Sequence, residues 1–261
     1  MPIVVGAEIR RLDDREFGEV VFETMRQIFA VHDELGRFFE EKIYQREIAF
    51  RIAGAQTEVP IDVTCDGFCK TYFIDLLVSR GAIFELKSVG TLADRHRSQL
   101  MHYLFLTDMP HGKLVNLRPE RVAHEFVNNV LARKDRTVFE VIDENWIESG
   151  EGLLKERMIT ALRDWGAALD IALYEEAATH FCDRDAEPLT EIEIGVQDRH
   201  LGVQKVRLAD PSTALKVTAL DVDLLPDFEC HARRFLAHTC LRAIHWINIT
   251  RPVVQFKTLR K

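Results

Sequence analysis

The chain has 261 residues, 47% of them hydrophobic, and a formal net charge of −8, which is typical of one large or two small globular domains. No apolar run approaches the roughly 18 residues of a membrane span, and Met1–Arg15 lacks the apolar core of a signal peptide, so we expect a cytoplasmic protein that makes no membrane contact. The acidic balance argues against indiscriminate nucleic-acid binding but leaves room for a local basic groove. The odd number of scattered cysteines predicts reduced thiols, and without a second close pair they predict no zinc site.

The N-terminal part predicts an extension, Met1–Asp14, followed by a long helix from about Arg15 to Leu35. Asp13 and Glu16 have the spacing of a capping box, which begins a helix. Apolar residues then recur at helical spacing, and Gly36 is a natural stop.

A second helix is expected from about Phe38 to Ile52. Glu41 and Tyr44 lie three residues apart on one face, so an acidic group follows an otherwise core-facing stripe. The next segment, EVPIDVTCDG, alternates apolar and polar residues before Asp66-Gly67, which predicts a strand and a tight turn.

The stretch Thr71–Ser88 predicts a central hairpin with its turn at Arg80-Gly81. Most of its positions are apolar, which indicates burial, yet Asp75 interrupts the first strand and Glu85 and Lys87 interrupt the second. The strand period of two places Glu85 and Lys87 on one face. Taken alone, such a trio is a surface salt bridge. In a buried hairpin, paired carboxylates are instead hard oxygen ligands of the kind that Mg²⁺ accepts.

The segment Thr91–Thr107 predicts another helix, with Gln99 and Tyr103 stacked one turn apart. One or two strands follow in KLVNLRPERVAHEFV. The order of helix, helix, three strands, helix and strand predicts an α/β fold with a mixed sheet flanked by helices.

Together these residues resemble the GxxExxY proteins, a branch of the PD-(D/E)XK nuclease superfamily with the restriction-endonuclease-like fold. The resemblance covers about Phe17–Val127. The matching residues are Glu41, Tyr44, Asp75, Glu85, Lys87, Gln99 and Tyr103. The glycine of the motif falls at Phe38 in this register, which leaves Glu40 as an alternative to Glu41.

The resemblance implies a site for Mg²⁺ or Mn²⁺ in which Asp75, Glu85 and the main-chain carbonyl of Leu86 are ligands and Glu41 assists. It further implies that Lys87 orients the attacking water and stabilises the transition state. Gln99 and Tyr103 are expected to complete the site or to contact the phosphate.

The second half is interpreted as a degenerate repeat, which predicts domains at residues 1–133 and 134–261. A shift of 132 positions brings Asn116 onto Asn248, and Tyr174 echoes Tyr44. The same shift replaces the catalytic positions, because Asp75, Glu85, Lys87 and Gln99 fall on Arg207, Val217, Ala219 and His231. An unrelated α/β domain is the alternative. Short basic clusters on the two helices, Arg95–Arg97 and His231–Arg234, are candidate phosphate contacts, although each taken alone is more typical of solvated surface.

We therefore expect a metal-dependent nuclease whose substrate is DNA, although the sequence does not separate DNA from RNA. One site per chain cuts one strand at a time, so cleavage of a duplex calls for a homodimer or two encounters. The alternatives are a catalytically silent scaffold of the same fold, binding nucleic acid or protein, and a metal-dependent enzyme with another substrate.

Overall fold

A computed structural model describes residues 2–148, 153–183, 189–197 and 199–261. The chain divides into two compact units. The first comprises Met1–Thr64 and Cys69–Arg133, and the second comprises Cys65–Phe68 and Lys134–Lys261. Within the described residues, no helix has the length and apolar character needed to cross a membrane.

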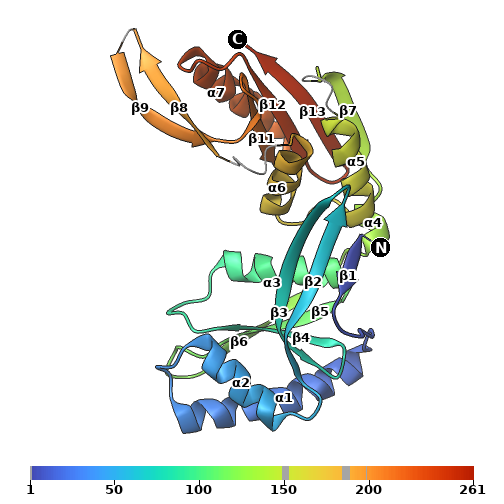
Figure 1. Ribbon diagram of the computed structural model, residues 1–261. Helices are drawn as coiled ribbons and strands as arrows, with labels where there is room; N and C mark the ends of the chain where they lie inside the picture. The colour runs from blue at the N-terminus through green and yellow to red at the C-terminus, as the bar shows by residue number, and fades with distance from the viewer. Residues whose placement is uncertain (1, 149–152, 184–188, 198) are drawn as a thin grey trace. The chain divides into compact units, whose positions relative to one another are not determined.

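The first unit is a mixed sheet of six strands in the order β1-β2-β3-β4-β5-β6, in which β4 and β5 run parallel. Helices α1 and α2 cover one face of this sheet and α3 covers the other (Figure 1). The expected mixed sheet flanked by helices is confirmed. The elements are β1 (Ile3–Val5), α1 (Asp14–Leu35), α2 (Glu41–Arg51), β2 (Gln56–Cys65), β3 (Phe68–Val78), β4 (Ala82–Lys87), α3 (Asp94–Thr107), β5 (His111–Asn116) and β6 (Ala123–Asn128).

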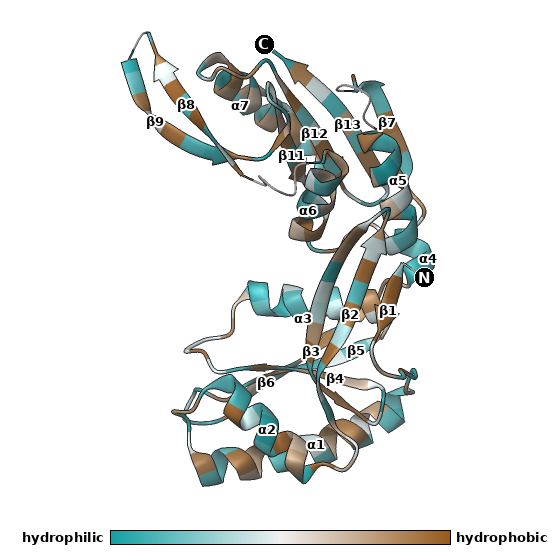
Figure 2. Cartoon of the chain, in the orientation of Figure 1, coloured by the Kyte–Doolittle hydropathy of each residue, from teal (hydrophilic) through white to brown (hydrophobic). Residues whose placement is uncertain are grey.

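Helix α1 begins and ends where the sequence predicts. The side chain of Asp13 accepts a hydrogen bond from the Glu16 amide at 2.8 Å, and the Glu16 carboxylate accepts one from the Asp13 amide at 3.2 Å. Gly36 ends the helix at φ 72°, in the left-handed region that favours glycine. Figure 2 shows hydrophobic and hydrophilic residues alternating along α1, as expected for a helix with one buried face.

Two local expectations need correction. Helix α2 begins at Glu41 and not near Phe38, because the residues before it are held in a turn by the Tyr44 hydroxyl, which accepts from the Phe39 amide. The expected N-terminal extension contains β1, which pairs with β2. The hairpin turn contains the predicted Arg80-Gly81, because Val78 pairs with Ala82, and it has positive φ at Ser79 and Arg80.

Strand β4 lies at the centre of the sheet, and all six of its residues are buried. Phe84 and Leu86 belong to the apolar core shared with α1 and α2. Since side chains alternate along a strand, Glu85 and Lys87 lie on the opposite face. That face is the one covered by α3, whose Leu100 packs closely on β5.

The second unit contains a sheet of five strands in the order β10-β11-β12-β13-β7 and a separate hairpin of β8 and β9. Strands β11 and β12 run parallel. The elements are α4 (Arg133–Arg136, which starts at the end of the first unit), β7 (Glu140–Asn145), α5 (Leu154–Trp165), α6 (Ile171–Phe181), β8 (Thr190–Val196), β9 (Arg199–Val206), β10 (Leu208–Asp210), β11 (Thr213–Thr218), η1 (Val222–Leu224), α7 (Leu225–Ala237), β12 (Ala243–Ile249) and β13 (Val253–Arg260).

The same tyrosine contact occurs at the second helix of each unit. Tyr44 donates a hydrogen bond to a glycine carbonyl eight residues earlier and accepts one from an amide five residues earlier. Tyr174 makes both bonds at the same spacings, again to a glycine carbonyl. Each tyrosine therefore closes the turn that leads into its helix.

An asparagine near the end of a central strand also makes equivalent bonds in each unit. The side chain of Asn116 accepts from the Val89 amide at 3.1 Å and donates to the Val89 carbonyl at 2.7 Å. Asn248 bonds the amide and carbonyl of Leu220 at 2.8 and 3.0 Å. In both units the asparagine fixes the chain that leaves the neighbouring parallel strand.

We predict that Tyr174→Phe destabilises the second unit by about 1–3 kcal/mol, because the buried Leu169 amide and Gly166 carbonyl lose their partner. All three tryptophans of the sequence, Trp146, Trp165 and Trp246, lie in this unit. Urea unfolding followed by tryptophan fluorescence therefore measures the change.

The matched control for this prediction is Thr160→Val, which removes an exposed hydroxyl that bonds the Glu156 carbonyl within α5. Its effect should stay within about 0.5 kcal/mol. An equal free energy of unfolding in Tyr174→Phe and Thr160→Val would contradict the assigned role of the tyrosine.

Candidate metal and phosphate site

The site lies where β3 and β4 separate. Their paired residues include Leu76 with Phe84, but at the next position the carboxylate of Asp75 accepts a hydrogen bond from the Leu86 amide at 2.8 Å. A side chain thus replaces the backbone acceptor that a continuing ladder would supply. The amide and carbonyl of one strand residue point to the same edge, so the Leu86 carbonyl also faces Asp75.

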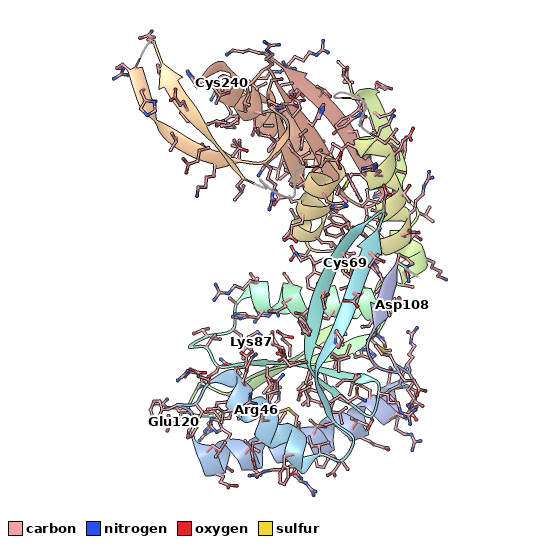
Figure 3. The ribbon with its side chains drawn as sticks, viewed as in Figure 1. Arg46, Cys69, Lys87, Asp108, Glu120 and Cys240 are labelled. Carbon is pink, nitrogen blue, oxygen red and sulfur yellow. The ribbon has the colours of Figure 1, made fainter. Side chains whose placement is uncertain are left out.

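Lys87, which is labelled in Figure 3, lies near three carboxylates. Its Nζ is 2.5 Å from Oε1 of Glu85, 3.7 Å from Oδ2 of Asp75 and 3.8 Å from Oε1 of Glu41. The side chain of Glu85 is fully buried, whereas that of Glu41 is 36% exposed. The site therefore opens to solvent on the α2 side and closes at β4. Fully ionised, these four groups carry a net charge of −2.

This excess negative charge changes the protonation of the site. Burial, and then the nearby Asp75 carboxylate, raises the pKa of Glu85 to about 8. Burial also raises the pKa values of Asp75 and Glu41. Burial lowers the pKa of Lys87, but the Glu85 and Asp75 carboxylates outweigh that effect and raise it overall. Lys87 is therefore an ammonium at neutral pH.

The donor set fits a divalent cation. When Glu85 is ionised, its buried Oε2 accepts no hydrogen bond from the described protein, which is costly for a carboxylate oxygen unless a cation meets it. No group of three or more His, Cys, Asp or Glu side chains within the described ranges is arranged to hold a metal. Mg²⁺ often takes only one or two carboxylates and completes its shell with water and substrate phosphate. Asp75, Glu85 and the Leu86 carbonyl form a set of that kind.

Gln99 and Tyr103 on α3 form a pair of their own. Nε2 of Gln99 donates to the Tyr103 hydroxyl at 3.0 Å. Burial, followed at longer range by the charges of Glu85 and Asp75, raises the pKa of Tyr103 to about 12, so its hydroxyl stays protonated. The hydrogen bond holds the two side chains in place, and the charges of Glu85 and Asp75 act on the Tyr103 hydroxyl.

The structure separates several alternatives that the sequence leaves open. Glu41, and not Glu40, reaches Lys87, because Glu40 occupies the N-cap of α2 and is exposed. In the basic cluster on α3, Arg97 is paired with Asp94 and Glu125. This arginine is therefore engaged within the protein and is a poor candidate for a phosphate contact.

Two residues of the site were missed by sequence reasoning. Nε2 of Gln45 donates to Oε1 of Glu58 at 2.9 Å and to the Asp75 carbonyl at 2.6 Å. Glu58 has φ 52°, a conformation that is uncommon for residues other than glycine, and its charge raises the pKa values of Asp75 and Glu41. Gln45 is one turn beyond Glu41 on a buried face, which is the only sequence signal that points to it.

The comparisons with known proteins concern the same part of the chain. Residues 18–128 match the model of the PD-(D/E)XK nuclease superfamily. The PD-(D/E)XK match covers α1 to β6 and includes every candidate site residue named above. Among curated proteins we found no match. One solved structure, described as "Crystal structure of SSO0001", is 24% identical over 46% of this chain and 62% of that chain, with a TM-score of 0.29. No argument rests on that likeness.

We predict that one carboxyl group titrates near pH 8 in the metal-free protein and that this signal disappears in Glu85→Gln. Because its folded-state pKa is raised, Glu85 destabilises the fold increasingly as the pH rises from about 4.5 to about 8. Carboxyl ¹³C NMR in EDTA measures the titration, and Mg²⁺ should lower the pKa. The matched control is Glu120→Gln, an exposed residue (Figure 3). Titration of every carboxyl below pH 6 would contradict the assignment.

Proposed function

We propose that the first unit is a metal-dependent nuclease that hydrolyses phosphodiester bonds of DNA. The observation that carries the proposal is the contact of one ammonium, Lys87, with three carboxylates inside the segment that matches the PD-(D/E)XK superfamily. The three carboxylates keep this lysine positively charged, and with all four groups ionised the site still has an excess of negative charge. Both a divalent ion and a phosphate meet complementary groups there.

In this mechanism Asp75, Glu85 and the Leu86 carbonyl would hold Mg²⁺ or Mn²⁺, and Glu41 would assist through water. When bound, the ion would polarise the phosphate and lower the pKa of water. Glu85 must lose its proton for the ion to bind, so its raised pKa makes metal binding weaker at acidic pH.

Lys87 has two roles in the proposal. Its ammonium donates to the attacking water and orients it, and it stabilises the negative charge that develops on the phosphate oxygens. The water adds to phosphorus and releases a proton to solvent, the bond from phosphorus to the leaving oxygen breaks, and the leaving oxygen takes a proton from solvent. Because its own pKa is raised, Lys87 acts through charge and not as a base.

The remaining residues position these groups. Gln45 bonds the Asp75 carbonyl and Glu58, which fixes the strand that carries the metal ligand. The Gln99 amide donates a hydrogen bond to the Tyr103 hydroxyl, and the second N–H of the amide would donate to a phosphate oxygen.

The second unit is proposed to be a degenerate copy of the first. The equivalent tyrosine and asparagine bonds support this proposal, as do two helices that follow one strand and precede the others, and a parallel pair of central strands. A chain with one competent site cuts one strand at a time. Cleavage of both strands of a duplex then calls for a homodimer or two encounters.

We predict that Lys87→Ala lowers cleavage at least about 100-fold, because transition-state charge loses its partner, while divalent-metal binding is largely retained. Asp75→Ala should lose both. The assay is cleavage of linear, nicked, flapped and branched DNA and of RNA with Mg²⁺ or Mn²⁺, with calorimetry for metal binding.

Lys42→Ala is the matched control, since Lys42 is an exposed lysine of α2 and the same truncation there should leave cleavage unchanged. Undiminished cleavage by Lys87→Ala would sink the lysine assignment. Metal binding by the wild type without cleavage of any substrate would favour the silent scaffold.

A further inference from the structure

The second unit contains a pocket of about 440 Å³ between α6, β9, β11 and α7. This volume is within the range of small-ligand sites. The pocket walls differ in character, with charged side chains on the α6 and β11 side and aromatic side chains on the α7 side. Each wall suits a different part of one ligand.

The charged wall is cationic. Arg207 and Lys216 flank Glu175, with Nε of Arg207 at 3.8 Å and Nζ of Lys216 at 3.9 Å from its two carboxylate oxygens. Lys205 and His231 also line the pocket. Of the described lining residues, Glu175 is the acidic one, but Lys205 also lies 3.8 Å from Glu191 outside the lining. Three permanent cations therefore face two carboxylates, which leaves a positive local charge in a chain of net charge −8.

The opposite wall presents Phe228 and Phe235 of α7. The ring of Phe228 lies 4.4 Å from that of Trp246 at an interplanar angle of 32°, which holds Phe228 against the core. A fixed aromatic ring beside cations is the arrangement on which a nucleobase stacks while its phosphate is neutralised.

The strand register relates this pocket to the site of the first unit. Asn116 pairs with Lys87 across β4 and β5, and Asn248 pairs with Thr218 across β11 and β12. Glu85 lies two residues before Lys87, and Lys216 lies two residues before Thr218. Lys216 therefore takes the place that Glu85 has in the first unit. The constant shift of 132 positions is therefore wrong by one residue on this strand, because the second unit has one more residue between β11 and β12.

We propose that this pocket binds a nucleoside phosphate, as one nucleotide of a single-stranded nucleic acid, without a metal ion. Arg207 and Lys216 take the phosphate directly, and the base lies against Phe228. Where the first unit has the carboxylate of Glu85, which would bind a metal ion, the second unit has the ammonium of Lys216. This ammonium binds the phosphate directly. The comparison of the two strands rests on the proposed repeat, whereas the binding requires no cleavage by the first unit.

The test is fluorescence anisotropy of a fluorescein-labelled single-stranded oligonucleotide with the full chain in EDTA, where metal-dependent cleavage is silent. Lys216→Glu should weaken binding at least about 10-fold and reduce the salt dependence by about one charge. Lys216 is 52% exposed, so folding should survive. The matched control is Arg242→Glu, an exposed cation of the same unit outside the pocket lining, and it should change binding less than 2-fold.

Photocrosslinking of an oligonucleotide that carries 5-iodouracil locates the base, and the expected crosslink is to the segment 217–233, which contains Phe228. Competition with mononucleotides and oligonucleotides then separates the two sources of a nucleoside phosphate, and displacement by either supports the pocket. Equal binding by Lys216→Glu and Arg242→Glu, or crosslinks confined to residues 1–133, would overturn the proposal. Since Lys87→Ala leaves this pocket intact, loss of cleavage and loss of pocket binding are distinguishable.

Discussion

The first unit depends on keeping three carboxylates and one ammonium together at the end of a buried strand. Glu85 is fully buried and Asp75 is its neighbour, so the two cannot both ionise without a nearby cation. Lys87 supplies one positive charge, and a divalent ion would supply the rest. With all four groups ionised, the site therefore has an excess of negative charge, whereas the charges of a purely structural salt bridge are balanced.

The fold sustains this arrangement through β4. Its other face is apolar and belongs to the core with α1 and α2, so the strand cannot rotate to expose Glu85 without losing Phe84 and Leu86 from that core. The opening lies beside β4, where the Asp75 carboxylate, and not a backbone carbonyl of β3, accepts the hydrogen bond of the Leu86 amide. Burial on one face and interrupted pairing at one edge together create a charged site inside a stable sheet.

The sequence was most informative where the signal is local. A strand period of two was enough to bring Glu85 and Lys87 to one face, and capping residues were enough to bound α1. The contact of Gln45 with the Asp75 carbonyl could not be predicted, because it depends on how α2 packs on β3 and no spacing encodes that packing. The same limit explains the one-residue error on β11, since an added residue in a connection leaves no mark in the periodicity of either strand. The catalytic roles of Glu41, Asp75, Glu85, Lys87, Gln99 and Tyr103 stay predictions.

The two units show which parts of such a framework can change independently. Both units have the tyrosine bonds that close a turn and the asparagine bonds that fix the chain leaving a central strand, and these bonds are buried or part-buried. The charges at the centre are held by long side chains that reach into a pocket, so their sign can change without disturbing the backbone. In the proposed repeat, Lys216 takes the position of Glu85 and lies beside a helix that carries its counter-charge, Glu175. On the two proposals made above, the same fold would carry an acidic site for a metal ion in one unit and a cationic site for a phosphate in the other.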